Sequence, residues 1–267
     1  MTQPQGRTAL VTGASAGIGR DIARRLAADG VTVAVHYGRR KEAAQETVAA
    51  IEEAGGHAFT VGADLTADGA VDTLFAELEE ALEGRGLDIL VNNAGVSLGR
   101  DTPSDMAQDD YVAGISHVTT EVFDSLFAIN ARAPFFVIQR ALPLMGEGGR
   151  IINISSAVTR IAWPLLAYAM SKGALEIMGS RLAQQLGPRG ITVNTVAPGI
   201  TDTEMNSWVH ETPGAEEGIS AMTALGRLGL PDDISAVVAF LASEEARWVT
   251  GQLIDASGGL CLAPGGM

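Results

Sequence analysis

Short runs of β-branched and apolar residues alternate along the chain with longer segments in which apolar residues recur every three to four positions. Residues 8–12 form such a run, and in the segment after it Ile18, Ile22 and Leu26 recur at four-residue steps. Side chains at this spacing share one face of a helix, which predicts a helix that packs against a sheet. Residues 31–35 are again β-branched, so the predicted order is strand, helix, strand.

The alternation continues through the rest of the chain. Strands are predicted at residues 8–12, 31–35, 57–62, 87–92, 150–155, 192–197 and 252–255. Helices are predicted at residues 17–29, 41–54, 68–83, 120–144, 168–186 and 231–242. This order is typical of an α/β fold in which helices cover both faces of a parallel sheet. Because no Pro-, Gly- or Ser-rich linker and no repeat divides the chain, residues 1–267 are predicted to form one domain.

Two long connections interrupt the alternation, and both follow predicted strands at their carboxyl ends, where open parallel sheets bind ligands. Residues 96–119 are polar and rich in Asp, which suits either a solvated loop or a functional one. Residues 204–230 carry Met205, Trp208 and Met222, and we predict that this segment is a substrate lid.

The composition supplies enough apolar material for a core, since 46% of the residues are hydrophobic and 19% are charged. General disorder is therefore excluded. The chain has 18 Lys and Arg residues against 32 Asp and Glu residues, a net charge of −14. Such a surface repels a phosphate backbone, so we expect no nucleic-acid partner.

Other features bear on compartment and metals. Cys261 is the single cysteine and cannot form an internal disulfide, which favours a reducing compartment. The first twenty residues lack the basic start and apolar stretch of a leader, and no apolar run reaches membrane-spanning length. We therefore expect a cytoplasmic protein that does not associate with membranes. His57, His117 and His210 lack the spacing of metal ligands, so no metal is expected.

A glycine-rich turn, TGASAGIG at residues 12–19, joins the first predicted strand to the first predicted helix. Gly13, Gly17 and Gly19 permit a tight turn and a close approach of backbone to a ligand. The helix that follows offers unpaired N–H groups and the positive end of its dipole. The turn therefore predicts a binding site for the pyrophosphate of a nucleotide, although the same pattern also occurs in purely structural turns.

Further motifs follow in order along the chain. They are NNAG at 92–95, Asn130 in LFAINA, Ser155 and Ser156 at the end of a strand, Tyr168 and Lys172 in YAMSK, and PG at 198–199. Together with the three residues between Gly13 and Gly17, this set resembles the short-chain dehydrogenase/reductase family over nearly the whole chain. The resemblance implies a Rossmann-like, doubly wound parallel sheet of about seven strands and an oxidoreductase that uses a nicotinamide cofactor.

Tyr168 and Lys172 lie four residues apart, so their side chains share one face of a helix. A nearby ammonium favours the ionised form of a phenol, whose pKa is otherwise about 10, and Tyr168 then exchanges a proton with a carbonyl or alcohol oxygen. A hydroxyl from Ser156 would hydrogen-bond the same oxygen. The resemblance implies the same roles, with Lys172 also holding the nicotinamide ribose and Asn130 keeping a water in a proton relay.

Two serines compete for this role. Ser156 stands 12 positions before Tyr168, one fewer than the usual family spacing, which Ser155 would match. We prefer Ser156 because the strand fixes its register and a one-residue deletion in the loop 159–166 is easily tolerated. Adjacent strand residues point to opposite faces, so only one of the two serves, and Ser155 is the alternative.

The form of the cofactor is predicted from the end of the second strand, where a carboxylate would bind the ribose diol of NAD. His36 stands there instead, and Arg39 and Arg40 follow closely enough to neutralise a 2′-phosphate, so NADP(H) is favoured. Alternatively, the arginines merely cover the next helix. Asp64 resembles the family residue that contacts adenine, but it also suits a helix cap. The predicted cofactor-binding residues are Gly13, Ser15, Ala16, Gly17, Ile18, Gly19, His36, Tyr37, Arg39, Asp64, Leu65, Asn92, Ala94, Gly95, Tyr168, Lys172, Pro198, Gly199, Thr201 and Thr203.

The predicted activity is hydride transfer between NADPH and a ketone. Apolar side chains precede Tyr168 and recur in the lid, which indicates an apolar, aromatic or polyketide-type ketone from bacterial specialised metabolism, such as antibiotic biosynthesis. They are Trp163, Leu165, Leu166, Met205, Trp208 and Met222. Their alternative role is packing within the core and the lid.

Three other functions stay open. A 3-oxoacyl-(acyl-carrier-protein) reductase of fatty-acid synthesis needs a basic docking patch, for which Arg132, Arg140 and Arg160 are candidates, although the net charge of −14 opposes it. A non-catalytic NADP-binding regulator has no use for an activated phenol at Tyr168. The third is a redox-assisted epimerisation, dehydration or deoxygenation.

The resemblance also bears on assembly. The predicted helices at 120–144 and 168–186 resemble those that pair across family dimers, and the C-terminal strand resembles one that joins a second interface. We therefore expect a homotetramer, with a dimer as the alternative.

Overall fold

The computed structural model describes residues 6–97, 115, 118–260 and 262, so Cys261, His117 and most of the segment 96–119 lie outside the described residues. A seven-stranded sheet runs through the described part of the chain in the order β3-β2-β1-β4-β5-β6-β7, and all neighbouring strands are parallel. The strands are β1 (Thr8–Val11), β2 (Thr32–Tyr37), β3 (His57–Gly62), β4 (Ile89–Asn92), β5 (Arg150–Ile154), β6 (Thr192–Pro198) and β7 (Leu253–Ala256).

Helices connect the strands. The α-helices are α1 (Gly17–Ala28), α2 (Lys41–Glu53), α3 (Ala70–Leu82), α4 (Thr120–Phe127), α5 (Ala133–Ala141), α6 (Leu166–Leu186), α7 (Trp208–Glu211), α8 (Ala215–Met222) and α9 (Pro231–Ala242). Shorter elements are the π-helical turn η3 (Ala128–Arg132) and the 3₁₀ turns η4 (Ala157–Thr159), η5 (Gly187–Arg189) and η6 (Glu204–Asn206). Within the described ranges, no helix has both the length and the apolar character that a bilayer crossing requires.

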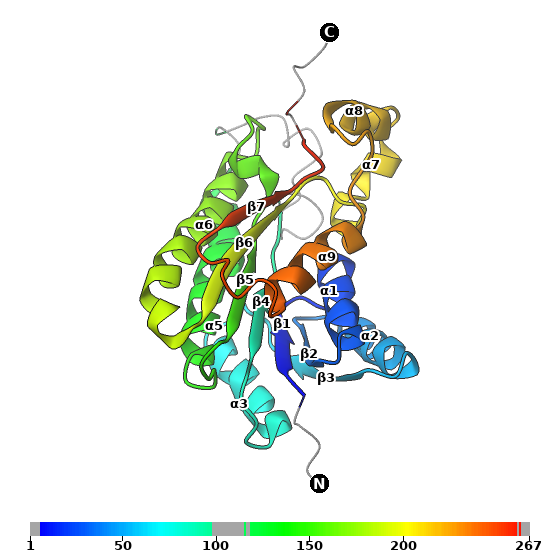
Figure 1. The fold of residues 1–267 in the computed structure, drawn as a ribbon. Coiled ribbons are helices and arrows are strands. Elements are labelled where there is room, and N and C mark those ends of the chain that lie inside the picture. Colours follow the sequence, from blue (N-terminus) through cyan, green and yellow to red (C-terminus); the bar gives the residue numbers. More distant parts are fainter. Residues whose placement is uncertain (1–5, 98–114, 116–117, 261, 263–267) are drawn as a thin grey trace.

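The two faces of the sheet have separate cores because side chains alternate along each strand. Leu10, Leu90 and Ile151 are in register on one face and belong to the core formed with α3, α5 and α6. Val11 and Val91 follow them, point to the other face and pack with α1 and α9. Figure 1 shows the resulting layers, with α1, α2 and α9 on one side of the sheet and α3, α5 and α6 on the other. This confirms the predicted α/β fold class.

The predicted helix at residues 120–144 is not continuous. α4 ends at Phe127, the π-helical turn η3 follows, and α5 ends at Ala141. The π turn carries the buried Asn130, whose Oδ1 accepts from the Val96 N–H at 3.0 Å while its Nδ2 donates to the Val96 carbonyl at 2.9 Å. A π turn adds a residue without removing the apolar stripe, so the periodicity does not reveal it. The other predicted elements agree with the structure to within two residues at each end.

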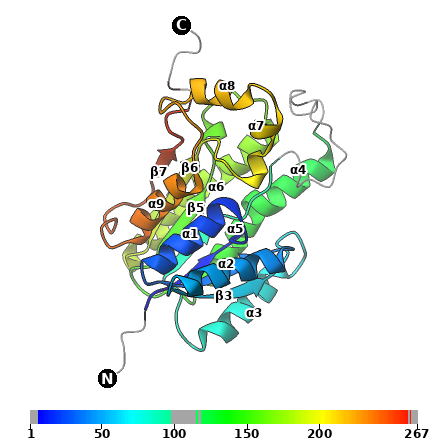
Figure 2. The ribbon, with the colours of Figure 1, turned by 90° about the vertical axis from the view of Figure 1, so that its right-hand side faces the viewer.

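After β6 the chain leaves the sheet, and α7 and α8 lie together at one end of the molecule (Figure 2). Their apolar side chains Val209 and Ile219 form a small cluster with Leu228. Trp163, which precedes α6, and Trp208 pack against this cluster. The segment predicted as a lid therefore has a small apolar core of its own, which contacts the residues just before α6 through Trp163.

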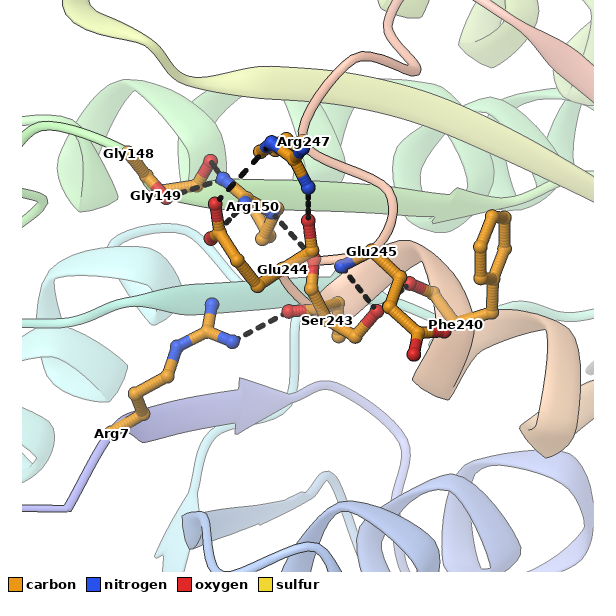
Figure 3. A network of polar contacts seen from close by, with 10 residues as sticks. Arg7, Gly148, Gly149, Arg150, Phe240, Ser243, Glu244, Glu245 and Arg247 are labelled. Atoms are coloured by element: carbon orange, nitrogen blue, oxygen red, sulfur yellow. Dashed lines mark hydrogen bonds and ion pairs between the residues drawn. The ribbon is translucent and has the colours of Figure 1, made fainter.

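Arg150 begins β5 with a guanidinium that is almost entirely buried (Figure 3). It donates to the carbonyls of Gly148 at 2.5 Å and Gly149 at 3.2 Å, and it pairs with Glu244 at 3.2 Å. Its Nε also donates to the carbonyl of Ser243, directly after α9, at 3.4 Å. Carbonyls at the end of a helix carry partial negative charge, so this cation ties β5 to the end of α9.

Replacing Arg150 with Met should lower the free energy of unfolding by roughly 2–4 kcal/mol, because Met fills space but removes the donor to the Gly148 and Ser243 carbonyls and the cation beside Glu244. Urea unfolding followed by circular dichroism measures the loss. Arg247→Met is the matched control, since Arg247 is 67% exposed and 4.0 Å from Glu244, and it should cost less than about 0.5 kcal/mol. Equal midpoints for Arg150→Met and the wild type would contradict this role.

Candidate active site

The turn between β1 and α1 is shaped to receive an anion. Gly13 has a φ of +65°, and a Cβ on it would lie 2.8 Å from the Cα of Ala94, just after β4. Gly17, with a φ of +53°, begins α1, and the preceding Ala16 has no side chain that caps the helix. The first N–H groups of α1 therefore lack a side-chain acceptor, which is the arrangement that binds phosphate groups.

Asn93 holds this turn in place, although the cofactor contact was predicted for its neighbour Asn92. Its Nδ2 donates to the carbonyls of Thr12 at 2.9 Å and Gly13 at 3.1 Å, and the Thr12 hydroxyl accepts from the Asn93 N–H at 3.0 Å. Asn92, predicted to bind the cofactor, is instead buried and donates to Asn153 Oδ1 at 2.9 Å. It joins β4 to β5. Adjacent strand residues point in opposite directions, so the alternation of β4 was the signal that could have separated the two asparagines.

His36 also serves the turn rather than offering a hydrogen bond to the cofactor. Its Nδ1 accepts from the Gly13 N–H at 3.0 Å, so Nδ1 carries no proton. The neutral ring is then protonated at Nε2, which donates to the carbonyl of Ala63 at 3.0 Å. Burial lowers the pKa of His36 to about 4, which keeps the ring neutral. Because main-chain groups occupy both ring nitrogens, the ring has no nitrogen left for a hydrogen bond to the ribose, although His36 lines the cleft and its contact with the cofactor stays a prediction.

Tyr37, the last residue of β2, packs on the neighbouring strand, and its predicted contact with the cofactor stays a prediction. A Cβ on Gly62 would lie 2.6 Å from the Tyr37 hydroxyl oxygen, so the ring lies over the paired strand β3. Tyr37 is not among the residues that line the cleft.

A cleft with a volume of about 1190 Å³ extends from the glycine-rich turn to α6. It exceeds the roughly 300–1,000 Å³ typical of a pocket for one small ligand, so it has room for a dinucleotide and a second molecule. The predicted residues that line it are Gly13, Ser15, Ala16, Gly17, Ile18, Gly19, His36, Arg39, Asp64, Leu65, Ala94, Gly95, Ser156, Tyr168, Lys172, Pro198, Gly199, Thr201 and Thr203. Tyr37, Asn92 and Asn130 do not line it.

Tyr168 and Lys172 lie one turn apart near the start of α6, and both are buried in the wall of the cleft. Lys172 Nζ donates to the carbonyl of Ile154 at 2.9 Å and lies 5.9 Å from the centre of the Tyr168 ring. Burial lowers the pKa of Lys172 from 10.5 to about 8. The site therefore still holds a cation beside the phenol at neutral pH.

The two serines after β5 have different surroundings. Ser155 is 4% exposed, and its hydroxyl donates to Glu176 Oε1 at 2.6 Å. Ser156 is half-buried in the cleft wall, where its Oγ accepts a long bond of 3.4 Å from the Val158 N–H. The Ser155 hydroxyl thus donates its hydrogen to a carboxylate, whereas no described residue accepts the hydrogen of the Ser156 hydroxyl, which can be donated to a ligand.

Asn130 lies behind the cleft wall. A Cβ on Gly95 would lie 3.0 Å from Lys172 Nζ and 3.2 Å from Asn130 Oδ1, so the missing side chain of Gly95 leaves a gap between these two polar groups. Asn130 also donates to the Ser171 hydroxyl at 3.0 Å. The amide is therefore fixed near Lys172 from behind.

Two ion pairs stand beside the end of β2. Arg39 Nε lies 2.9 Å from Asp64 Oδ2, and Asp64 Oδ1 accepts from the Thr66 N–H at 3.1 Å. The Thr66 hydroxyl and the Arg39 guanidinium hold the pKa of Asp64 below its usual value. Arg40 pairs with Glu204 at the start of the lid segment. Both arginines therefore line the cleft instead of covering α2.

Apolar side chains line the part of the cleft beside Tyr168. They are Val158, Ile161, Trp163, Leu165, Met205 and Trp208. Two residues from the predicted apolar set do not take part: Leu166 is 49% exposed on α6, and Met222 packs against the small core of the lid segment. No three His, Cys, Asp or Glu side chains within the described ranges are grouped as metal ligands.

Because the pKa of His36 is about 4 in the folded chain and about 6.5 in the unfolded one, the unfolded chain binds more protons between these values. Stability should therefore fall as pH is lowered from about 6.5 to 4, and His36 should account for up to roughly 3 kcal/mol of that fall. His36→Gln should show a flatter dependence of unfolding free energy on pH over this window. His57→Gln is the control because His57 is exposed on β3. Parallel curves for wild type and His36→Gln would contradict the assignment.

Known proteins share this architecture. Residues 13–261 match a family model described as enoyl-(acyl carrier protein) reductase, which falls within the short-chain dehydrogenase/reductase family. Among curated proteins, an uncharacterised oxidoreductase of Methylorubrum extorquens is 44% identical over 267 residues, which cover 97% of this chain and 100% of that protein.

Two solved structures are also similar. One is the angucycline C-6 ketoreductase LanV with bound NADP, with 50% identity, a TM-score of 0.87 and coverage of 96% of each chain. The other is the promiscuous reductase LugOII, which catalyses keto-reduction at C1 during lugdunomycin biosynthesis, with 48% identity, a TM-score of 0.87 and coverage of 96% of this chain and 98% of that one. Since a family model matches most of the chain and close relatives span it, the chain belongs to the short-chain dehydrogenase/reductase family of oxidoreductases.

Proposed function

We propose that the protein is an NADPH-dependent ketoreductase acting on an apolar, polyketide-type ketone in bacterial specialised metabolism. One observation carries the proposal. The paired Tyr168 and Lys172, with Ser156 nearby in the same wall, face a cleft that begins at an anion-binding turn and is apolar beside the phenol. LanV and LugOII, both ketoreductases by description, support this reading.

The residues present fit NADP(H). Gly13 lets the turn after β1 pack closely on Ala94, and α1 begins without a side-chain cap. Arg39 and Arg40 lie at the end of β2, where His36 stands in the position of the carboxylate that would bind NAD. A 2′-phosphate would find two guanidinium groups there. When bound, NADPH supplies the hydride that adds to the carbonyl carbon of the substrate.

Tyr168 and its neighbours complete the reaction at the carbonyl oxygen. The Tyr168 hydroxyl donates its proton to that oxygen as negative charge develops on it. Lys172 stabilises the phenolate that remains, because its cation lies beside the ring. Ser156 donates a hydrogen bond to the same oxygen. Asn130, fixed behind Lys172, is assigned to holding a water through which Tyr168 regains a proton.

The substrate class follows from the apolar wall beside Tyr168. Trp163 and Trp208 line the cleft, and Met205 adds a flexible apolar side chain that is 41% exposed. Flat aromatic ligands pack well against such side chains. We assign residues 204–230 as the lid that covers this end.

A 3-oxoacyl-(acyl-carrier-protein) reductase remains the alternative, but two of the three arginines in the predicted basic patch are paired with carboxylates, while Arg132 donates to the Thr66 carbonyl. Arg140 pairs with Asp72 and Glu79, and Arg160 pairs with Asp255. An acidic carrier would have to displace these partners. A non-catalytic regulator and a redox-assisted epimerisation, dehydration or deoxygenation are outcomes that the assay below distinguishes.

We propose a homotetramer in the cytoplasm, with a dimer as the alternative. Phe135, Phe136 and Ile177 expose apolar surface on α5 and α6, which lie on the same side of the sheet (Figure 1). Trp248, 95% exposed, and Phe240 form a second exposed group after and within α9. Two separate apolar surfaces suit the two interfaces of a tetramer.

The first experiment is NADPH oxidation by the purified protein against cyclic, aromatic and acyl-thioester ketones. We expect reduction of aromatic polycyclic ketones. Turnover restricted to acyl thioesters would favour the fatty-acid alternative, and NADPH binding without turnover would favour a regulator. Product that forms without net NADPH consumption would indicate a redox-assisted reaction.

Variants in the same assay test the proton donor and the serine. Tyr168→Phe should bind NADPH normally but lose at least about 100-fold in kcat, because no proton reaches the carbonyl oxygen. Ser156→Ala should lose about as much, whereas Ser155→Ala should lose only a few-fold, since its hydroxyl points to Glu176. A larger loss of kcat in Ser155→Ala than in Ser156→Ala would assign the hydrogen bond to the carbonyl oxygen to Ser155 instead.

Arg39→Ala should raise the KM for NADPH by roughly 10- to 100-fold and leave the KM for NADH unchanged, because it removes a charge-assisted bond to the 2′-phosphate only. Steady-state kinetics with both nucleotides gives the ratio. Arg24→Ala, an exposed change on α1 outside the cleft, is the control. An equal rise with both nucleotides would contradict a role for Arg39 in selecting NADP(H).

A further inference from the structure

Glu176 is a carboxylate beside the proposed catalytic group to which neither the sequence motifs nor the mechanism assigns a role. It lies on α6 one turn after Lys172 and is half-buried. Its Oε1 accepts from the Ser155 hydroxyl at 2.6 Å and lies 2.8 Å from the Thr159 hydroxyl. No Lys, Arg or His of the described ranges lies within ion-pair distance of Glu176, and the side-chain partners of its carboxylate there are two hydroxyl groups.

The two hydroxyls that Glu176 holds flank Ser156. Ser155 precedes it, and Thr159 ends the turn η4 that follows it. The Thr159 hydroxyl also lies 3.0 Å from the Ser156 carbonyl, so its single hydrogen is shared between that carbonyl and Glu176. Ser156 itself is extended, with φ −161° and ψ 146°, and within the described ranges its Oγ makes only the long bond from the Val158 N–H. The segment that carries Ser156 is thus fastened on both sides to one carboxylate.

That carboxylate belongs to the helix that carries Tyr168 and Lys172. The three residues follow at four-residue steps, so they share a face of α6, and the rigid helix fixes their mutual positions. Fastening Ser155 and Thr159 to Glu176 therefore sets the position of Ser156 relative to Tyr168 and Lys172.

We propose that Glu176 is a positioning residue that holds Ser156 in register with Tyr168 and Lys172. The inference rests on the proposed function, because it gives Ser156 a catalytic role. Glu176 does not touch the substrate. It acts through the two hydroxyls beside Ser156, and small displacements of such groups reduce catalysis strongly.

The test is a double-mutant cycle with Glu176→Ala and Ser156→Ala, measured on whichever ketone the wild type reduces. Glu176→Ala should lower kcat at least about 10-fold and leave the KM for NADPH unchanged. In the Ser156→Ala background it should lower kcat less than about twofold, because its effect passes through Ser156. Glu176→Gln should retain most of the activity, since an amide oxygen still accepts from both hydroxyls. Gln184→Ala, an exposed change on the same helix, is the control.

Amide hydrogen exchange of residues 156–160 supplies a readout that needs no turnover. We expect faster exchange in Glu176→Ala than in the wild type and in Glu176→Gln. If Glu176→Ala fails to fold, Thr159→Val removes one of the two bonds and should give a smaller effect in the same direction. Unchanged exchange, or equal losses of kcat in both serine backgrounds, would overturn the proposal. An inactive wild type would instead overturn the proposed function, while the exchange data would still decide whether Glu176 holds the segment.

Discussion

The reversal of strand order between β1 and β4 is the constraint on which the site depends. Chain segments leave these two strands in opposite directions, so a crevice opens at their carboxyl ends. Close packing of Gly13 on Ala94 sets the width of that crevice. Asn93 and His36 then bind the main chain of the glycine-rich turn from β4 and β2, so three strands hold the place where an anion would bind.

The second requirement is a helix rigid enough to carry the proposed proton chemistry. Lys172 is buried against the Ile154 carbonyl, and burial lowers its pKa to about 8, so keeping it charged at neutral pH opposes folding. This loss of stability accompanies a cation that lies beside the Tyr168 ring, where it can stabilise a phenolate. Because Glu176 lies on the same helix, the segment after β5 is fastened to the element that carries the other two groups.

Positive charge is concentrated at one end of the cleft, although the protein as a whole is strongly acidic. The net charge is −14, yet the end of β2 presents Arg39 and Arg40 to the cleft. Each arginine has a carboxylate partner, Asp64 or Glu204, that orients it in the absence of a phosphate. An anionic ligand can therefore bind at one end of the cleft although the surface as a whole repels anions, and the apolar end beside Tyr168 is kept separate.

Periodicity and motif order were sufficient to predict the parallel sheet, its two helix layers and the helical spacing of Tyr168 and Lys172, because these properties depend on local repeats. Contacts between distant segments were not predictable in this way. Asn92 and Asn93 are adjacent and chemically identical, but their side chains have different partners. Asn92 is buried and bonds Asn153 of β5, whereas Asn93 bonds the main chain of the turn after β1. His36 was predicted to contact the ribose, but in the folded chain both of its ring nitrogens bond main-chain groups of Gly13 and Ala63. Local spacing thus determined the elements, whereas only tertiary packing decided which polar side chains remain available to a ligand.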